Sequence, residues 1–146
     1  MAFSGKTLIT VSAVIDSPVE KAWSLFTDPQ HIMHWNHASD DWHTTRAEND
    51  LVVGGKFLSR MEARDGSAGF DFTGIYNSIL LHKFIGYTIA DGRSVSVIFA
   101  DKQNKTEITE TFEAELSDPL EMQKTGWQSI LNNFKRYVED YTDEKV

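Results

Sequence analysis

The sequence predicts an α+β fold in which one curved antiparallel sheet of about six or seven strands wraps around a long C-terminal helix. Two observations carry this prediction. Large apolar side chains recur at helical spacing along one stripe of residues 119–141. Residues 55–115 instead alternate in the manner of β-strands almost throughout. A single helix that closes a curved sheet can enclose a pocket, so the pattern predicts a shape and leaves the occupant open.

The first expected element is a strand over residues 6–15. Both of its alternating sets contain β-forming side chains, which is typical of a strand covered on much of both faces. The next residues predict a helix with a capping box: Ser17 at the N-cap, Pro18 at the first helical position and Glu20 at the third. This helix is expected to end at the Asp-Pro pair of residues 28–29.

A second short helix is expected over about residues 30–33, so two short helices follow the first strand. The irregular, aromatic stretch 34–49 contains a short strand around residues 42–46. Asp-Gly pairs then indicate turns between alternating segments. The remaining strands are predicted at 56–63, 68–79, 82–90, 93–100 and 105–114.

The final helix spans about residues 119–141, and Ser117 is expected to cap it as Ser17 caps the first. Gly126 lies inside this helix, where glycine costs about 1 kcal/mol relative to alanine. We hypothesise that Gly126 lets the helix approach the sheet or leaves room beside Trp127.

Length and composition predict one domain over residues 1–146. The N-terminal residues show no signal-peptide pattern, and cytoplasmic location is therefore expected. The absence of cysteine excludes disulfides, thiolate metal sites and cysteine nucleophiles. A formal net charge of −8 disfavours nucleic acid and anionic membrane as partners, and no apolar run is long enough to span a bilayer.

Several motifs resemble the START-like, Bet v-like helix-grip superfamily (SRPBCC). The opening segment Asp16-Ser-Pro-Val-Glu-Lys-Ala-Trp, followed by Asp28-Pro and His34-Trp35, is similar to the start of such proteins. The segments Gly54-Gly55-Lys56-Phe57, Asp65-Gly66 with Gly69-Phe-Asp-Phe-Thr-Gly-Ile-Tyr76, and Gly126-Trp127 resemble the branch of activator of heat-shock protein 90 ATPase homologues. The resemblance extends over about residues 7–141.

This resemblance implies a helix-grip fold with a cavity between the sheet and the C-terminal helix. In the wider superfamily such cavities bind lipids, sterols, polyketides and other hydrophobic molecules, and some members are cyclases or hydrolases. The co-chaperone role belongs to eukaryotic relatives with an additional domain, and it is not carried over to these 146 residues. The superfamily shares no catalytic set, so no catalytic residue and no cofactor is predicted from it.

The aromatic side chains are the strongest site signal, because they are too many for one wall of a core. One interpretation is that each is simply core; the other is that some line a cavity of roughly 300–1,000 Å³. We predict that a small hydrophobic molecule is bound by Trp23, Trp35, Trp42, Phe57, Met61, Phe70, Phe72, Tyr76, Phe112, Trp127 and Leu131. Tyr76, His34 and Trp127 are expected to orient it.

A metal site is one interpretation of His31, His34 and His37, which recur at spacings of three close to Asp40, Asp41 and His43. No His-Glu-x-x-His pattern is present, and part of the set lies past the expected helix end. The favoured interpretation is a rim loop with hydrogen-bonded imidazoles, without a metal.

Charged residues in the strands are expected to form an outer salt-bridge ladder, because period two places Arg60, Glu62 and Asp71 opposite the aromatic positions. Glu110 is the one candidate for an inward carboxylate, since it shares parity with Phe112. An inward acid can serve as a general acid or base with a raised pKa.

Three function classes follow. The preferred one is a protein that binds a small hydrophobic or aromatic molecule and performs no chemistry. The alternatives are a stress- or chaperone-associated interaction module, which a filled groove would favour, and an enzyme acting on a polyketide or aromatic substrate, which a buried unpaired carboxylate in a hollow groove would favour. Homodimerisation through a sheet face or edge strand stays open.

Overall fold

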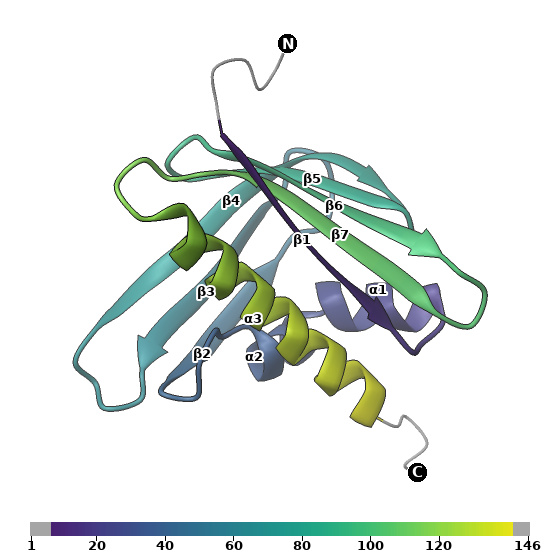
Figure 1. The fold of residues 1–146 in the computed structure, drawn as a ribbon, viewed down its shortest axis with the longest axis horizontal. Coiled ribbons are helices and arrows are strands. Elements are labelled where there is room, and N and C mark those ends of the chain that lie inside the picture. The colour runs from purple at the N-terminus through teal and green to yellow at the C-terminus, as the bar shows by residue number, and fades with distance from the viewer. Residues whose placement is uncertain (1–6, 142–146) are drawn as a thin grey trace.

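The computed structural model describes residues 7–141 and contains one seven-stranded antiparallel sheet with three helices (Figure 1). The predicted α+β class and the order of the elements are confirmed. The elements are β1 (Leu8–Ile15), α1 (Val19–Thr27), α2 (Pro29–Trp35), β2 (Trp42–Asn49), β3 (Lys56–Ala63), β4 (Gly69–Leu80), β5 (Phe84–Ile89), β6 (Ser94–Asp101), β7 (Thr106–Glu113) and α3 (Leu120–Asp140).

The strand order is β1-β7-β6-β5-β4-β3-β2, so six consecutive strands form a meander and β1 joins it beside β7. Figure 1 shows α3 lying across one face of the curled sheet, with α1 and α2 near its C-terminal half. Among residues 7–141, no helix combines the length and the apolarity that crossing a membrane requires.

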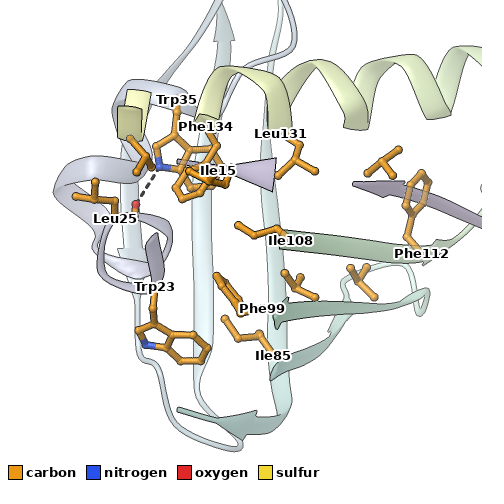
Figure 2. Packing of buried hydrophobic residues seen from close by; sticks show 14 of the residues in the cluster. Ile15, Trp23, Leu25, Trp35, Ile85, Phe99, Ile108, Phe112, Leu131 and Phe134 are labelled. Atoms are coloured by element: carbon orange, nitrogen blue, oxygen red, sulfur yellow. Dashed lines mark hydrogen bonds between the residues drawn. The ribbon is translucent and has the colours of Figure 1, made fainter. Parts of the chain in front are cut away.

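One part of the core lies where α3 meets the two short helices. Phe134 is fully buried, and its ring packs edge-on against Phe26 and Trp35 at centroid distances of 5.2 and 4.9 Å. The indole Nε1 of Trp35 donates a hydrogen bond of 3.0 Å to the carbonyl of Leu25, as Figure 2 shows. These contacts fix α1 and α2 against the C-terminal half of α3.

Side chains of α3 also cover the free edge of β1. Gln128 Nε2 donates to the carbonyl oxygen of Ser12 at 3.0 Å, and Lys135 Nζ donates to that of Val14 at 2.7 Å. Unpaired edge carbonyls are a template for pairing with another chain, and these contacts occupy two of them. The long helix therefore anchors one edge of the sheet as well as covering its face.

Both predicted serine caps are wrong. The N-cap of α1 is Pro18, without a side-chain hydrogen bond, and the Ser17 hydroxyl donates instead to the Pro18 carbonyl at 3.1 Å. Ser17 is buried at the junction of β1 and α1, where its carbonyl accepts a 2.8 Å bond from the Thr106 hydroxyl. Ser17 is therefore the residue before the N-cap, and its backbone is held by the contact with Thr106.

At the start of α3 no side chain caps the helix, and the side chain of Gln123 instead bonds the loop that precedes it. Its Oε1 accepts a bond from the Glu115 amide at 2.8 Å, while its Nε2 donates to the carbonyls of Glu115 and Asp118 at 2.9 and 3.0 Å. The Ser117 hydroxyl instead contacts the Glu115 carboxylate at 3.3 Å. A glutamine inside the helix therefore fixes the loop that precedes it.

Two elements are longer than expected. The second helix spans seven residues, because the Asp28 side chain accepts the Gln30 amide at 2.9 Å and so caps it. The strand β2 has eight residues, and its pairing with β3 shifts register between Thr44 and Arg46. A bulge of this kind interrupts the period-two pattern, which explains why only its first half was predicted.

Gly126 does not have the role that we hypothesised, since a Cβ placed there has no neighbouring atom within 4 Å. The helix therefore has space for a side chain. We expect Gly126→Ala to raise the free energy of unfolding by about 0.5–1 kcal/mol, because alanine loses less backbone entropy in a helix. Urea unfolding of the two proteins measures this difference, and a destabilised variant would restore the close-approach explanation.

Candidate ligand-binding cavity

A hollow of about 370 Å³ lies between the inner face of the sheet and the helices. Its walls come from all three helices and from β2, β3, β4, β5 and β7 together with the segments that follow β5 and β7. Most lining side chains are apolar. The groove is therefore not filled by the large side chains of α3.

The aromatic wall centres on Phe57 of β3. Its ring lies 4.9 Å from that of Tyr87 and 5.4 Å from that of Tyr76, with Phe72 at 5.7 Å. Gly74 makes this arrangement sterically feasible, because a Cβ at that position would lie 2.5 Å from the Phe57 ring. Four aromatic rings from three neighbouring strands thus form one continuous surface.

Seven of the eleven predicted binding residues line this cavity: Trp35, Phe57, Met61, Phe70, Phe72, Tyr76 and Trp127. The other four lie outside the lining. Trp23 packs on Phe99 at 4.9 Å in the core, and Leu131 is 1% exposed there. Phe112 is covered by the stacked indole of Trp127 at 3.9 Å, and Trp42 lies 5.9 Å from the Phe70 ring.

The two-residue alternation of the strands correctly identifies which side chains face inward. It does not show which of these side chains reach the cavity surface and which are covered by others. Phe112 faces inward, but the indole of Trp127 covers it and lines the cavity in its place. Several lining residues were not predicted, among them Phe26, Ile32, Ile85, Tyr87 and Ile130. Tyr87 shares parity with the inward residues of β5, and this signal was available in the sequence.

Glu110 is the most unusual lining residue. It is 8% exposed, and its partners across β1 and β6 are Val11 and Val97. Among the described residues, no side chain or backbone group forms a hydrogen bond or an ion pair with its carboxyl group. Burial in these apolar surroundings raises the pKa of Glu110 from its ordinary value of 4.5 to about 8.

The outer ladder is therefore confirmed, and Glu110, the candidate for an inward carboxylate, lines the cavity. On the outer face, Arg60 forms ion pairs with Glu62 at 3.0 Å and with Asp71 at 3.3 Å. Glu107 lies on the same strand as Glu110 and pairs with Lys102 at 3.8 Å. Two carboxylates of β7, three residues apart, thus occupy opposite faces of the sheet.

Two phenols complete the polar part of the wall. The Tyr76 hydroxyl donates to Asn49 Oδ1 at 2.6 Å, and burial raises the pKa of Tyr76 to about 12. Burial also raises the pKa of Tyr87 well above its ordinary value, and the nearby charge of Glu110 acts in the same direction. Both phenols therefore stay neutral at physiological pH and offer hydrogen bonds.

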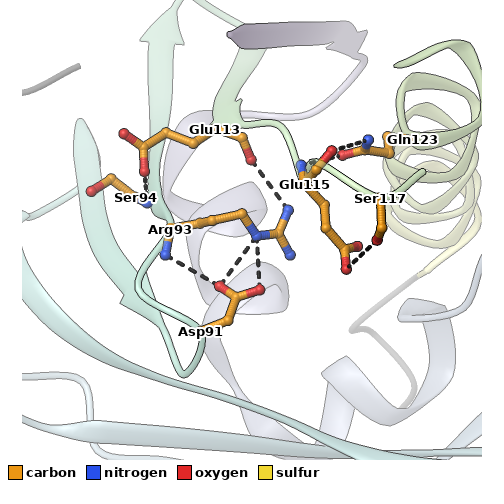
Figure 3. Close-up of polar contacts among 7 residues, drawn as sticks. All are labelled: Asp91, Arg93, Ser94, Glu113, Glu115, Ser117 and Gln123. Atoms are coloured by element: carbon orange, nitrogen blue, oxygen red, sulfur yellow. Dashed lines mark hydrogen bonds and ion pairs between the residues drawn. The ribbon is translucent and has the colours of Figure 1, made fainter. Parts of the chain in front are cut away.

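The cavity has a polar rim near the turn between β5 and β6. Figure 3 shows the polar contacts of the residues there. The Arg93 guanidinium binds the Asp91 carboxylate at 2.9 Å and donates to the Glu113 carbonyl at 3.2 Å. The Glu113 carboxylate in turn accepts the Ser94 amide at 2.8 Å. Arg93 and Glu115 both line the cavity, so this rim carries charges of both signs.

The histidines lie outside the cavity lining. His31 Nδ1 lies 2.6 Å from the Tyr137 hydroxyl, and the exposed His34 ring stacks on Tyr137 at 5.6 Å. His34 is therefore not placed to orient a ligand in this cavity. Burial lowers the pKa of His37. Within residues 7–141, no three His, Asp or Glu side chains converge in an arrangement that would hold a metal ion.

Comparison with known proteins gives consistent results. A sequence model of the family described as Activator of Hsp90 ATPase homolog 1-like protein matches residues 16–139. A search among curated proteins found no match.

Among solved structures, the AHSA1-like protein from Aeromonas hydrophila is 47% identical, with a TM-score of 0.86 over 91% of this chain and 92% of that one. Chr148 from Cytophaga hutchinsonii is 42% identical, with a TM-score of 0.78 over 93% and 97% of the two chains. CV1439 from Chromobacterium violaceum is 22% identical and supports the fold alone, with a TM-score of 0.82 over 92% and 99%.

Proposed function

The chain belongs to the Activator of Hsp90 ATPase homolog 1-like family, and from that premise we propose that it binds one small hydrophobic or aromatic molecule without chemical conversion. The binding site is the cavity between the sheet and α3. The observation that carries the proposal is the hollow itself, about 370 Å³ lined mostly by apolar and aromatic side chains. This volume lies in the range of known ligand pockets.

The composition of the wall supports this function. Apolar rings supply affinity through the surface that a ligand removes from water, while a few polar groups give orientation. Tyr76, Tyr87 and Trp127 line the cavity and carry polar groups of this kind. A filled groove would favour a protein that acts only through its surface, and the groove is hollow.

Filling the cavity should abolish binding. We expect Ile130→Trp, which adds bulk to the lining from α3, to weaken binding of hydrophobic probes at least tenfold, because the added ring occupies the ligand's space. Native mass spectrometry of the purified protein, followed by organic extraction, first identifies any bound molecule. Titration calorimetry with that molecule then compares the variant with the unaltered protein.

The matched control is Ile98→Trp, because Ile98 lies on the outer face of β6 and is 46% exposed. This variant should bind like the unaltered protein. A clean mass without an adduct, together with no calorimetric response to a panel of hydrophobic molecules, would refute the proposed function. Equal binding by both tryptophan variants would place the ligand elsewhere on the chain.

Glu110 favours a second candidate function, that of an enzyme on an aromatic or polyketide-like substrate. A buried carboxyl group with a pKa of about 8 is protonated near neutral pH and can donate its proton as a general acid. The test is conversion of the extracted molecule by the unaltered protein but not by Glu110→Gln. Recovery of an unchanged molecule from both proteins would reject catalysis.

The family description also names an ATPase activator, and chaperone contact therefore remains an alternative of the interaction class. The hollow cavity does not favour it. Homodimerisation likewise stays a prediction.

A further inference from the structure

The charged groups around the cavity are unbalanced. The lining contains three acidic side chains and one guanidinium, that of Arg93. Glu48 and Glu115 are exposed, and Glu48 pairs with Arg46, so Glu110 is the acidic group that lies inside the hollow without a counter-charge among the described residues. Arg93 is engaged by Asp91 at 2.9 Å and by the Glu113 carbonyl at 3.2 Å, so its charge is offset outside the lining. The whole chain carries a formal charge of −8. Once ionised, Glu110 gives this cleft a field that attracts cations.

Glu110 lies within the apolar part of the cavity wall. Val11 and Val97 flank it across the sheet, and Ile108 and Phe112 flank it along β7. The side chain is more than nine-tenths buried, borders the hollow and has no partner among the described residues. Ionising a buried carboxyl group without a partner is costly, and the charge of a cationic ligand would offset part of that cost.

The rest of the wall suits a cation with an apolar body. Tyr87, Phe57, Phe72 and Trp127 present aromatic rings to the same hollow as Glu110. The faces of such rings attract an ammonium group, and the interaction strengthens away from water. A buried carboxylate beside aromatic faces is thus a complementary site for nitrogen that carries a positive charge.

We propose that the ligand is a small organic amine with an aromatic or aliphatic body, whose ammonium group pairs with the Glu110 carboxylate. This inference rests on the proposed function, because it names the ligand class for the same cavity. The ammonium donates charge-assisted hydrogen bonds to Glu110, while the body packs on the aromatic wall. A neutral alcohol of the same shape keeps the packing and loses the ion pair.

Binding of the amine is linked to loss of a proton from Glu110. The titratable or charged groups that share its cavity are Tyr76 on β4, Tyr87 on β5, Glu48 on β2, and Arg93 and Glu115 at the rim, while α3 contributes no charge to the lining. Because Glu110 in the empty site has a pKa of about 8, affinity for the amine should increase about tenfold for each unit by which pH rises toward 8. Above pH 8 the affinity should level off.

The test compares naphthylethylamine with naphthylethanol by titration calorimetry at pH 7 and pH 9, below the amine's own pKa of about 10. The unaltered protein should bind the amine at least tenfold more tightly than the alcohol at pH 9. At pH 7, titrations in two buffers of different ionisation enthalpy should show about one proton released per amine bound. The alcohol should release none.

Glu110→Gln should weaken amine binding at least tenfold and leave alcohol binding unchanged or stronger. Glu107→Gln is the matched control, since it removes a carboxylate from the outer face of the same strand. Equal affinity for both probes, or a preference for the amine that survives in Glu110→Gln, overturns the amine inference and leaves ligand binding intact. Failure of both probes to bind overturns the inference as well, and the extraction experiment then decides the proposed function separately.

Discussion

Replacing Phe134 with alanine is expected to lower the free energy of unfolding by about 3–5 kcal/mol. Phe134 is fully buried and packs against both Phe26 and Trp35, so truncation removes apolar contact and leaves a cavity that rigid neighbours cannot fill. Domains of this size have only about 5–15 kcal/mol of stability. Urea unfolding followed by tryptophan fluorescence measures the loss.

Phe70→Ala is the matched control for this experiment. Phe70 is 50% exposed at the cavity, and its truncation should cost less than half as much. If the two variants were destabilised equally, the junction of α3 with α1 and α2 would not be the part of the core on which stability depends. Retained secondary structure in circular dichroism establishes that each variant is folded at the start of the titration.

Replacing Glu110 with glutamine is expected to stabilise the protein strongly at high pH. In the folded state burial raises the pKa of Glu110 from 4.5 to about 8. Each pKa unit corresponds to about 1.4 kcal/mol, so ionising this group in the fold costs roughly 5 kcal/mol as an upper bound. Glutamine resembles the protonated side chain and avoids that cost.

The sign follows from proton binding. Between pH 4.5 and about 8 the folded state keeps the proton that the unfolded state releases, so the stability of the unaltered protein falls as pH rises. Below pH 4.5 the group is protonated in both states and Glu110→Gln should have little effect. Above pH 8 the difference reaches its full value, several kcal/mol in favour of the variant.

Urea unfolding at pH 5, 7 and 9 tests this expectation. Glu107→Gln again provides the control, because an exposed carboxylate on the outer face should show no comparable dependence on pH. A constant difference between Glu110→Gln and the unaltered protein at all three pH values would mean that Glu110 ionises in the fold as readily as in water.

Most of the fold followed from sequence periodicity. The strand β3 has the predicted bounds, and the strands from β4 to β7 differ by one or two residues at their ends. Alternation is a local property of the chain, and it is reliable wherever one face of a strand is buried. It was least informative for β2, whose register shift between Thr44 and Arg46 interrupts the pattern.

The predicted caps show where local rules end. A serine three residues before a glutamate is a capping signal, but Ser17 is held by Thr106 of a distant strand and does not cap. At α3 the long side chain of Gln123 donates to the carbonyls of residues 115 and 118, and Ser117 does not cap the helix. Both outcomes depend on contacts that the local pattern does not encode.

The sequence by itself determined the α+β class, the order of the elements, the face of each regular strand and the inward parity of Glu110. Periods of two and 3.6 record which side of an element is buried, and this is a one-dimensional property. Only the tertiary structure decided which inward residues line the hollow and which, such as Phe112 and Leu131, are covered. It also decided that none of the described side chains pairs with Glu110, because depth and pairing depend on how the curled sheet and α3 meet in space.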